Sequence, residues 1–100
     1  MYENYAGTQN LTADGAVGTS GTPVRVFSVN FLSGGGGAGV VILRNGTSAG
    51  ATAYLQIDGT TSKGTIVPIS TPGMHFPAGC FVDIDTNVSY CTVTYFKETA

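Results

Sequence analysis

The sequence has few of the features that mark nucleic-acid-binding and membrane proteins. It contains no tryptophan, and charged residues make up only 10% of the chain, against about a quarter in an average globular protein. Its four Lys and Arg residues are scattered, whereas nucleic-acid binding needs clustered basic residues that neutralise phosphates. No segment approaches the roughly 20 consecutive apolar residues of a membrane-spanning helix. The composition therefore argues against nucleic acid and against a membrane as partners.

A catalytic or metal-binding constellation is also missing. His75 is the only histidine, and no nearby residue suggests a catalytic triad, so packing in a loop is favoured over acid–base catalysis. Asp83 and Asp85 are a possible cation pair, but calcium takes about six to eight oxygen ligands, which favours two solvated carboxylates. We therefore predict no catalytic residue, no cofactor and no metal site, and we expect that the protein is not an enzyme.

The N-terminal sequence MYENYAGTQN has neither the basic nor the apolar segment of a secretory signal, so we expect synthesis in a cytoplasm. The two cysteines, Cys80 and Cys91, share the spacing of the apolar residues around them. If their strands form a hairpin, the cysteines are diagonal neighbours, beyond the usual reach of a disulfide. Two buried free thiols are favoured, and a disulfide is the alternative.

Glycine is abundant instead, and it divides the chain into short apolar segments. Fifteen of the 100 residues are Gly, and the segments between them are rich in the β-branched and aromatic residues that favour strands. Several segments alternate apolar with polar residues, and none has a helical period. The predicted strands cover residues 24–32, 40–44, 53–58, 65–69, 80–85 and 88–96. We predict an all-β fold, a single small β-sandwich or a reduced jelly roll.

Turn signals suggest how these strands pair. Asn45-Gly46 predicts a hairpin between the second and third strands. The fourth strand is expected beside the third and at a sheet edge, because Pro68 has no amide donor. The last two strands are expected to form a hairpin. Along the first strand, strict alternation places Phe27 on the same face as Phe31.

Residues 1–22 are polar and rich in Gly and Thr. We predict an irregular N-terminal arm over 1–22 ahead of a β-sandwich domain over 23–100. The arm is either a frayed terminus or a segment that orders on a neighbouring subunit, with Tyr2 and Tyr5 as anchors. Phe81 and Tyr90 are expected on outer faces, where exposed aromatic residues mark a protein contact more often than a sugar platform. The candidate interface residues are Tyr2, Tyr5, Phe81 and Tyr90.

Five short segments occur in an order that resembles a known family. They are VILRNG at 41–46, LQID at 55–58, IVPI at 66–69, GMHFPAGCFV at 73–82 and CTVTYF at 91–96. This outline is similar to that of small virion proteins of tailed bacteriophages, especially marine and cyanobacterial phages. The motifs are mostly turns and core positions. The resemblance implies a virion component without enzyme activity, either a capsid decoration (cement) protein or a small neck, tail or fibre subunit.

From the resemblance and the low charge, we expect a decoration protein on the outer surface of the capsid. The expected partners are the major capsid protein and copies of the chain itself, with a trimer favoured. A tail, neck or fibre subunit is the alternative within the virion. A carbohydrate-binding module for host surface polysaccharide is the alternative from another class.

Overall fold

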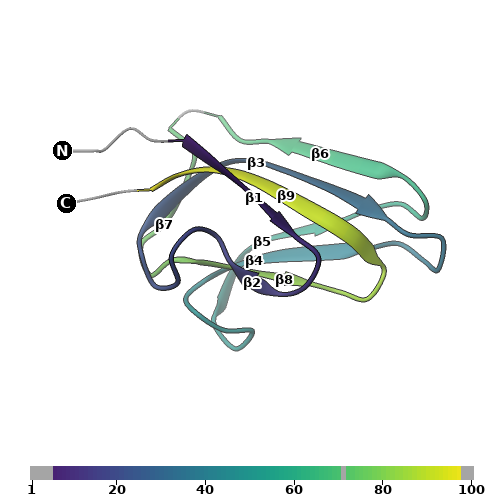
Figure 1. Ribbon diagram of the computed structural model, residues 1–100, viewed down its shortest axis with the longest axis horizontal. Helices are drawn as coiled ribbons and strands as arrows, with labels where there is room; N and C mark the ends of the chain where they lie inside the picture. The colour runs from purple at the N-terminus through teal and green to yellow at the C-terminus, as the bar shows by residue number, and fades with distance from the viewer. Residues whose placement is uncertain (1–5, 71, 98–100) are drawn as a thin grey trace.

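The computed structural model describes residues 6–70 and 72–97, which form two antiparallel sheets packed face to face (Figure 1). The larger sheet, sheet A, has the strand order β1-β9-β3-β6, and β7 also pairs with β3. The other sheet, sheet B, has the order β2-β8-β4-β5. The described residues contain no helix that is long and apolar enough to cross a membrane. This architecture confirms the predicted all-β sandwich.

The six strands predicted from the glycine-bounded segments are present, and the described residues contain three further strands, β1, β2 and β7. In chain order the strands are β1 (Ala6–Leu11), β2 (Gly15–Ala16), β3 (Val24–Ser33), β4 (Val40–Asn45), β5 (Thr52–Asp58), β6 (Gly64–Pro68), β7 (Met74–Phe76), β8 (Cys80–Ile84) and β9 (Val88–Lys97).

The core lies between the two sheets and is built from alternate residues of their strands. Its fully buried side chains are Phe31, Phe76, Leu43, Val17, Val24, Val26, Val29, Val41, Val82, Val93, Cys80 and Cys91. Because successive side chains of a strand point to opposite faces, the residues between these positions form the two outer faces of the sandwich. Those outer faces are the surfaces on which a function must be sought.

A β-bulge changes the face on which β3 places its residues. The register of β3 against β9 shifts between Val26 and Ser28, so Phe27 is an extra residue in the strand. Val24 and Val26 therefore point into the core together with Phe31. The strict alternation predicted for this strand is wrong, because the bulge restarts it one residue later.

Two of the predicted strand pairings are also wrong. The strand β6 pairs with β3 in sheet A and not with β5, which lies in sheet B. The strands β8 and β9 lie in different sheets, so the turn between them carries the chain from one sheet to the other. The hairpin of β4 and β5 is confirmed, and Pro68 lies in an edge strand as predicted.

The described part of the N-terminal block differs from the irregular segment expected there. The strand β1 pairs with β9 at the edge of sheet A, and β2 pairs with β8 at the edge of sheet B. Val17 is fully buried, and its amide donates a hydrogen bond of 2.9 Å to the carbonyl of Cys80. Backbone pairing thus gives regular structure to a sequence with few apolar residues. The boundary at residue 22 stays a prediction.

Candidate functional site

The outer face of sheet A is the broadest uncharged surface that the strand register defines. Across β9, β3 and β6, the register aligns Thr92 with Asn30 and Ile66, and Thr94 with Ser28 and Pro68. On the far side of β9, β1 adds Thr8 and Asn10. Hydroxyl and amide groups therefore fill the middle of this face.

Hydrophobic side chains lie at both ends of the same face. At the end near β7, the rings of Phe27 and Phe96 meet edge to face with centroids 4.5 Å apart. At the other end, Leu32 is paired with Tyr90, and Ile66 stands beside them on β6. Ile66 is 75% exposed and Tyr90 is 44% exposed. Exposed apolar residues gathered around a charge-free centre are typical of a surface that another protein covers.

A shallow groove runs between β9 and β6 at this second end. It has a volume of about 250 Å³ and is lined by Asn30, Phe31, Gly64, Thr65, Ile66 and Tyr90. The amide oxygen Oδ1 of Asn30 is buried there without a hydrogen-bond partner in the structure. Because this oxygen is not exposed, it is not available to a partner that fills the groove.

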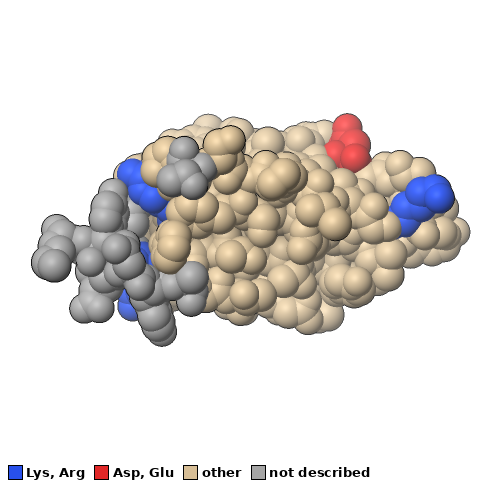
Figure 2. All heavy atoms as spheres, turned by 90° about the horizontal axis from the view of Figure 1, so that it is seen from above, with Lys and Arg blue, Asp and Glu red and all other residues tan. Residues whose placement is uncertain are grey.

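Charged groups lie at the margins of this surface. Figure 2 shows the molecule from above, the side of sheet A, with a mostly uncharged centre, basic atoms near the two ends and an acidic side chain near one of them. In the sequence, Lys97 is the last residue of β9 and Lys63 directly precedes β6. A partner can therefore cover the centre without desolvating a charge.

The outer face of sheet B is different, because it carries an ion pair. The guanidinium of Arg44 donates to Oδ2 of Asp83 from Nε at 3.1 Å and from Nη2 at 2.9 Å. It also donates from Nη1 to the carbonyl of Ala51 at 3.1 Å. Phe81 is half-buried beside Arg44 in the adjacent strand. The charged groups of Arg44 and Asp83 on this face therefore have their partners within the molecule.

The structure does not bring the predicted interface residues together. Tyr2 and Tyr5 lie outside the described residues. Phe81 is on the outer face of sheet B and Tyr90 is on the outer face of sheet A, so the shared hairpin expected for them does not exist. Tyr54, a further candidate for an aromatic platform, packs its ring against the buried Phe76 at a centroid distance of 5.4 Å. These aromatic residues therefore do not form one flat sugar platform.

The carboxylates are engaged individually and do not form a cluster. Asp83 is paired with Arg44, and Oδ1 of Asp85 accepts a hydrogen bond from the Asn87 amide at 2.9 Å. Among residues 6–70 and 72–97, no group of three or more His, Cys, Asp or Glu side chains is placed to hold a metal ion.

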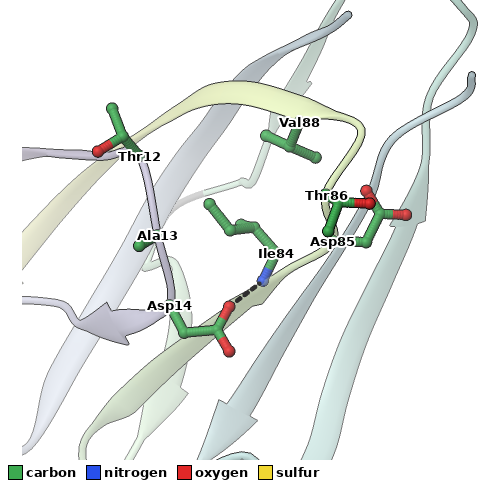
Figure 3. A pocket seen from close by; sticks show the side chains of 7 residues that line it. All are labelled: Thr12, Ala13, Asp14, Ile84, Asp85, Thr86 and Val88. Carbon is green, nitrogen blue, oxygen red and sulfur yellow. Dashed lines mark hydrogen bonds between the residues drawn. The ribbon is translucent and has the colours of Figure 1, made fainter. Parts of the chain in front are cut away.

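An open pocket of about 570 Å³ lies between the β1–β2 turn and the β8–β9 turn. Figure 3 shows that the carboxylates of Asp14 and Asp85, which both line it, do not point toward one another. Asp14 accepts a hydrogen bond of 2.8 Å from the backbone amide of Ile84. This hydrogen bond therefore links the β1–β2 turn to β8.

The two cysteines are buried free thiols, as predicted. Cys80 comes from sheet B and Cys91 from sheet A. Burial raises the pKa of Cys80 to about 12, with a further contribution from Cys91, and burial raises the pKa of Cys91 to about 11. Both groups are protonated at neutral pH and act as small apolar side chains rather than nucleophiles.

His75 lies on β7 with an exposed side chain, next to the buried Phe76. The strand β7 pairs with the start of β3, where Arg25 is opposite His75. A loop was expected at this position, and a short strand is found. Phe76 lies in the core, and Met74 is partly buried against it.

Sequence reasoning missed the surface around Ile66. The residue was placed in an edge strand beside the wrong neighbour, so its outward position next to Tyr90 and Leu32 was not recognised. The sequence held one signal for this surface. Ile66 and Pro68 share a face of their strand, and a proline is typical of an edge strand, so Ile66 could have been placed at a sheet edge.

No known protein-family model matches the chain, and neither does any curated protein. Solved structures with a similar outline include the disulfide-linked pili of Bacillus endospore appendages, with 12% identity, a TM-score of 0.49, and coverage of 96% of this chain and 88% of that chain. PirA has 14% identity, a TM-score of 0.42 and coverage of 98% and 97%. The Tobacco streak virus coat protein has 8% identity, a TM-score of 0.40 and coverage of 99% and 90%.

Proposed function

We propose that the protein is a non-enzymatic structural subunit of a virion, a capsid decoration (cement) protein that binds the outer surface of the shell. The observation that carries this proposal is the outer face of sheet A. It combines exposed Ile66 and Tyr90 with a wide uncharged centre. Such a face gains free energy when it is covered and loses little from desolvated charge.

A decoration protein stabilises the shell through mass action, because it binds only the assembled lattice. Each contact can be weak, since many identical copies act together and multivalency raises the overall avidity. The partners in this account are the major capsid protein and other copies of the chain, arranged as a symmetric oligomer with a trimer as the first expectation. The location is the virion surface.

Quantitative mass spectrometry of purified particles tests the proposal. We expect hundreds of copies per virion, in proportion to the number of capsid subunits. A handful of copies would instead assign the chain to a tail, neck or fibre. A protein that is made during infection but missing from purified particles would contradict both structural assignments.

The binding step can be tested separately with shells that lack the protein. Purified wild-type chain is expected to sediment with such shells and to raise the temperature at which they fall apart. A glycan array provides the contrasting experiment, because specific retention of a polysaccharide without binding to shells would favour a carbohydrate-binding module.

A further inference from the structure

We infer that a second copy of this chain covers the outer face of sheet A, with the apolar end formed by Ile66, Tyr90 and Leu32 as its main apolar contact. This inference deepens the proposed function, on which it rests: copies of the chain contact one another through this face, and the major capsid protein is bound through other surfaces.

The first support is the chemistry of the surface, which is compatible with itself. Its middle consists of hydroxyl and amide groups, which both donate and accept hydrogen bonds. One of these bonds already runs across the strands, from the Thr92 hydroxyl to Oδ1 of Asn10 at 3.0 Å. Because the middle of the face has no charge, two copies can meet there without like-charge repulsion. A contact through the same face of both copies is two-fold and makes a dimer, in place of the trimer first expected.

The second support is the shape of the apolar end. The groove of about 250 Å³ lies beside Ile66, which is itself 75% exposed. One molecule therefore carries both a projecting apolar side chain and a recess lined by apolar atoms. When two copies meet through this face, each offers the other a projection and a recess.

The third support is area. The strands β1, β9, β3 and β6 have 6, 10, 10 and 5 residues, so at about 4.8 Å between strands and about 3.3 Å per residue they present a face of roughly 500 Å². Two such faces together bury roughly 1,000 Å², which is the size of a weak protein interface. Sheet A is therefore large enough to hold a second copy, with an affinity that rises when many copies are assembled.

The outer face of sheet B does not fit this role. Its Arg44 and Asp83 are already paired with each other, and covering them costs desolvation free energy with no new partner of opposite charge in a second copy.

The experiment uses two variants that add the same charge to opposite faces. Ile66→Lys places a positive charge in the apolar end of the sheet A face, and the high exposure of Ile66 makes the change compatible with folding. Gln56→Lys, the matched control, adds the same charge to an exposed position on β5 in sheet B. Circular dichroism and thermal unfolding check that both variants are folded.

Sedimentation equilibrium over about 1 µM to 1 mM protein then gives the mass of the species in solution, and from it the affinity of self-association. We expect wild type and Gln56→Lys to associate, and Ile66→Lys to weaken association by about 30-fold or more, the loss typical of a main contact residue in an interface. Association of Ile66→Lys with unchanged affinity would overturn the inference. So would a wild-type chain that stays monomeric throughout, or loss of association in Gln56→Lys alone.

A labelling experiment locates the contact independently. In Ile66→Cys the new thiol is exposed, whereas Cys80 and Cys91 are buried. A maleimide should therefore react first at position 66, and more slowly as the protein concentration rises and the face becomes covered. A rate that does not change with concentration while the mass increases would place the contact elsewhere and overturn the inference.

These outcomes are separate from those of the proposed function. A monomeric chain that still binds shells would refute the self-association surface and leave the decoration role standing. A chain that associates through Ile66 but is missing from particles would support the self-association surface and refute the decoration role.

Discussion

The two outer faces of this sandwich come from strands of similar composition, yet they differ in how they use charge. On sheet B, Arg44 binds Asp83 and the Ala51 carbonyl, so its polar groups are satisfied within the molecule. On sheet A, the middle is hydroxyl and amide, and Ile66 and Tyr90 stay exposed. We therefore propose that the outer face of sheet B is exposed to solvent and that the outer face of sheet A is covered by a partner.

The acidic residues follow the same division. The aspartates in the described part of the chain are Asp14, Asp58, Asp83 and Asp85. Each of them lies on a strand of sheet B or in a turn that adjoins it. Exposed carboxylates oppose edge association and aggregation, so we expect their position to protect sheet B from such association.

The largest effect is expected from the core that supports both faces. Leu43 of β4 is fully buried, whereas its neighbour Ile42 points outward and is half-buried. Leu43→Ala should lower the free energy of unfolding by about 2–5 kcal/mol. Ile42→Ala, the adjacent control, should cost about 1 kcal/mol or less. Urea unfolding measures both, and equal losses would show that β4 does not have the inner and outer faces described.

The thiols supplied by the two sheets make stability sensitive to high pH. The pKa values of Cys80 and Cys91 are raised from 9.0 to about 12 and about 11. The unfolded chain therefore loses these protons first, and stability is retained below pH 9 but falls as the pH rises from 9 toward 12. The double variant Cys80→Ala, Cys91→Ala should show a smaller fall than wild type over pH 9–11. An identical fall would assign the alkaline loss to other groups.

A smaller effect is expected from the ion pair on sheet B. Arg44→Leu leaves Asp83 without its partner and removes the donor to the Ala51 carbonyl. We expect a loss of about 1–2 kcal/mol. Arg44→Lys keeps the charge but not the forked geometry, so it should recover part of that loss. Thermal unfolding at low and high salt measures the effect. No loss in Arg44→Leu would mean that this face is not stabilised by its charges.

The smallest effect on stability is expected at the most exposed residue of sheet A. In the monomer, Ile66→Lys should change the free energy of unfolding by no more than about 0.5 kcal/mol. The same substitution at Ile57 of β5, which is 8% exposed, should prevent folding or cost several kcal/mol, since it buries a charge (about 3 kcal/mol or more). A large loss at Ile66 would show that the side chain supports the fold rather than a partner.

The sequence predicted six of the nine strands found in the described residues and, for most of these six, which residues face inward; it did not predict β1, β2 and β7. It did not predict the partners of β6 and β9, because inward-facing residues alternate in the same way in both sheets and do not say which sheet a strand joins. Nor did it reveal the bulge at Phe27, which depends on the register against β9. The surface around Ile66 depends on both of these features, so it became visible only with the sheets assembled.

A density map of the assembled virion that contains the chain tests the central claim most directly. The account predicts many copies on the outside of the shell, with the outer face of sheet A covered by protein and the Arg44–Asp83 face of sheet B open to solvent. A map in which Ile66 and Tyr90 face solvent while the sheet B face is covered would contradict it.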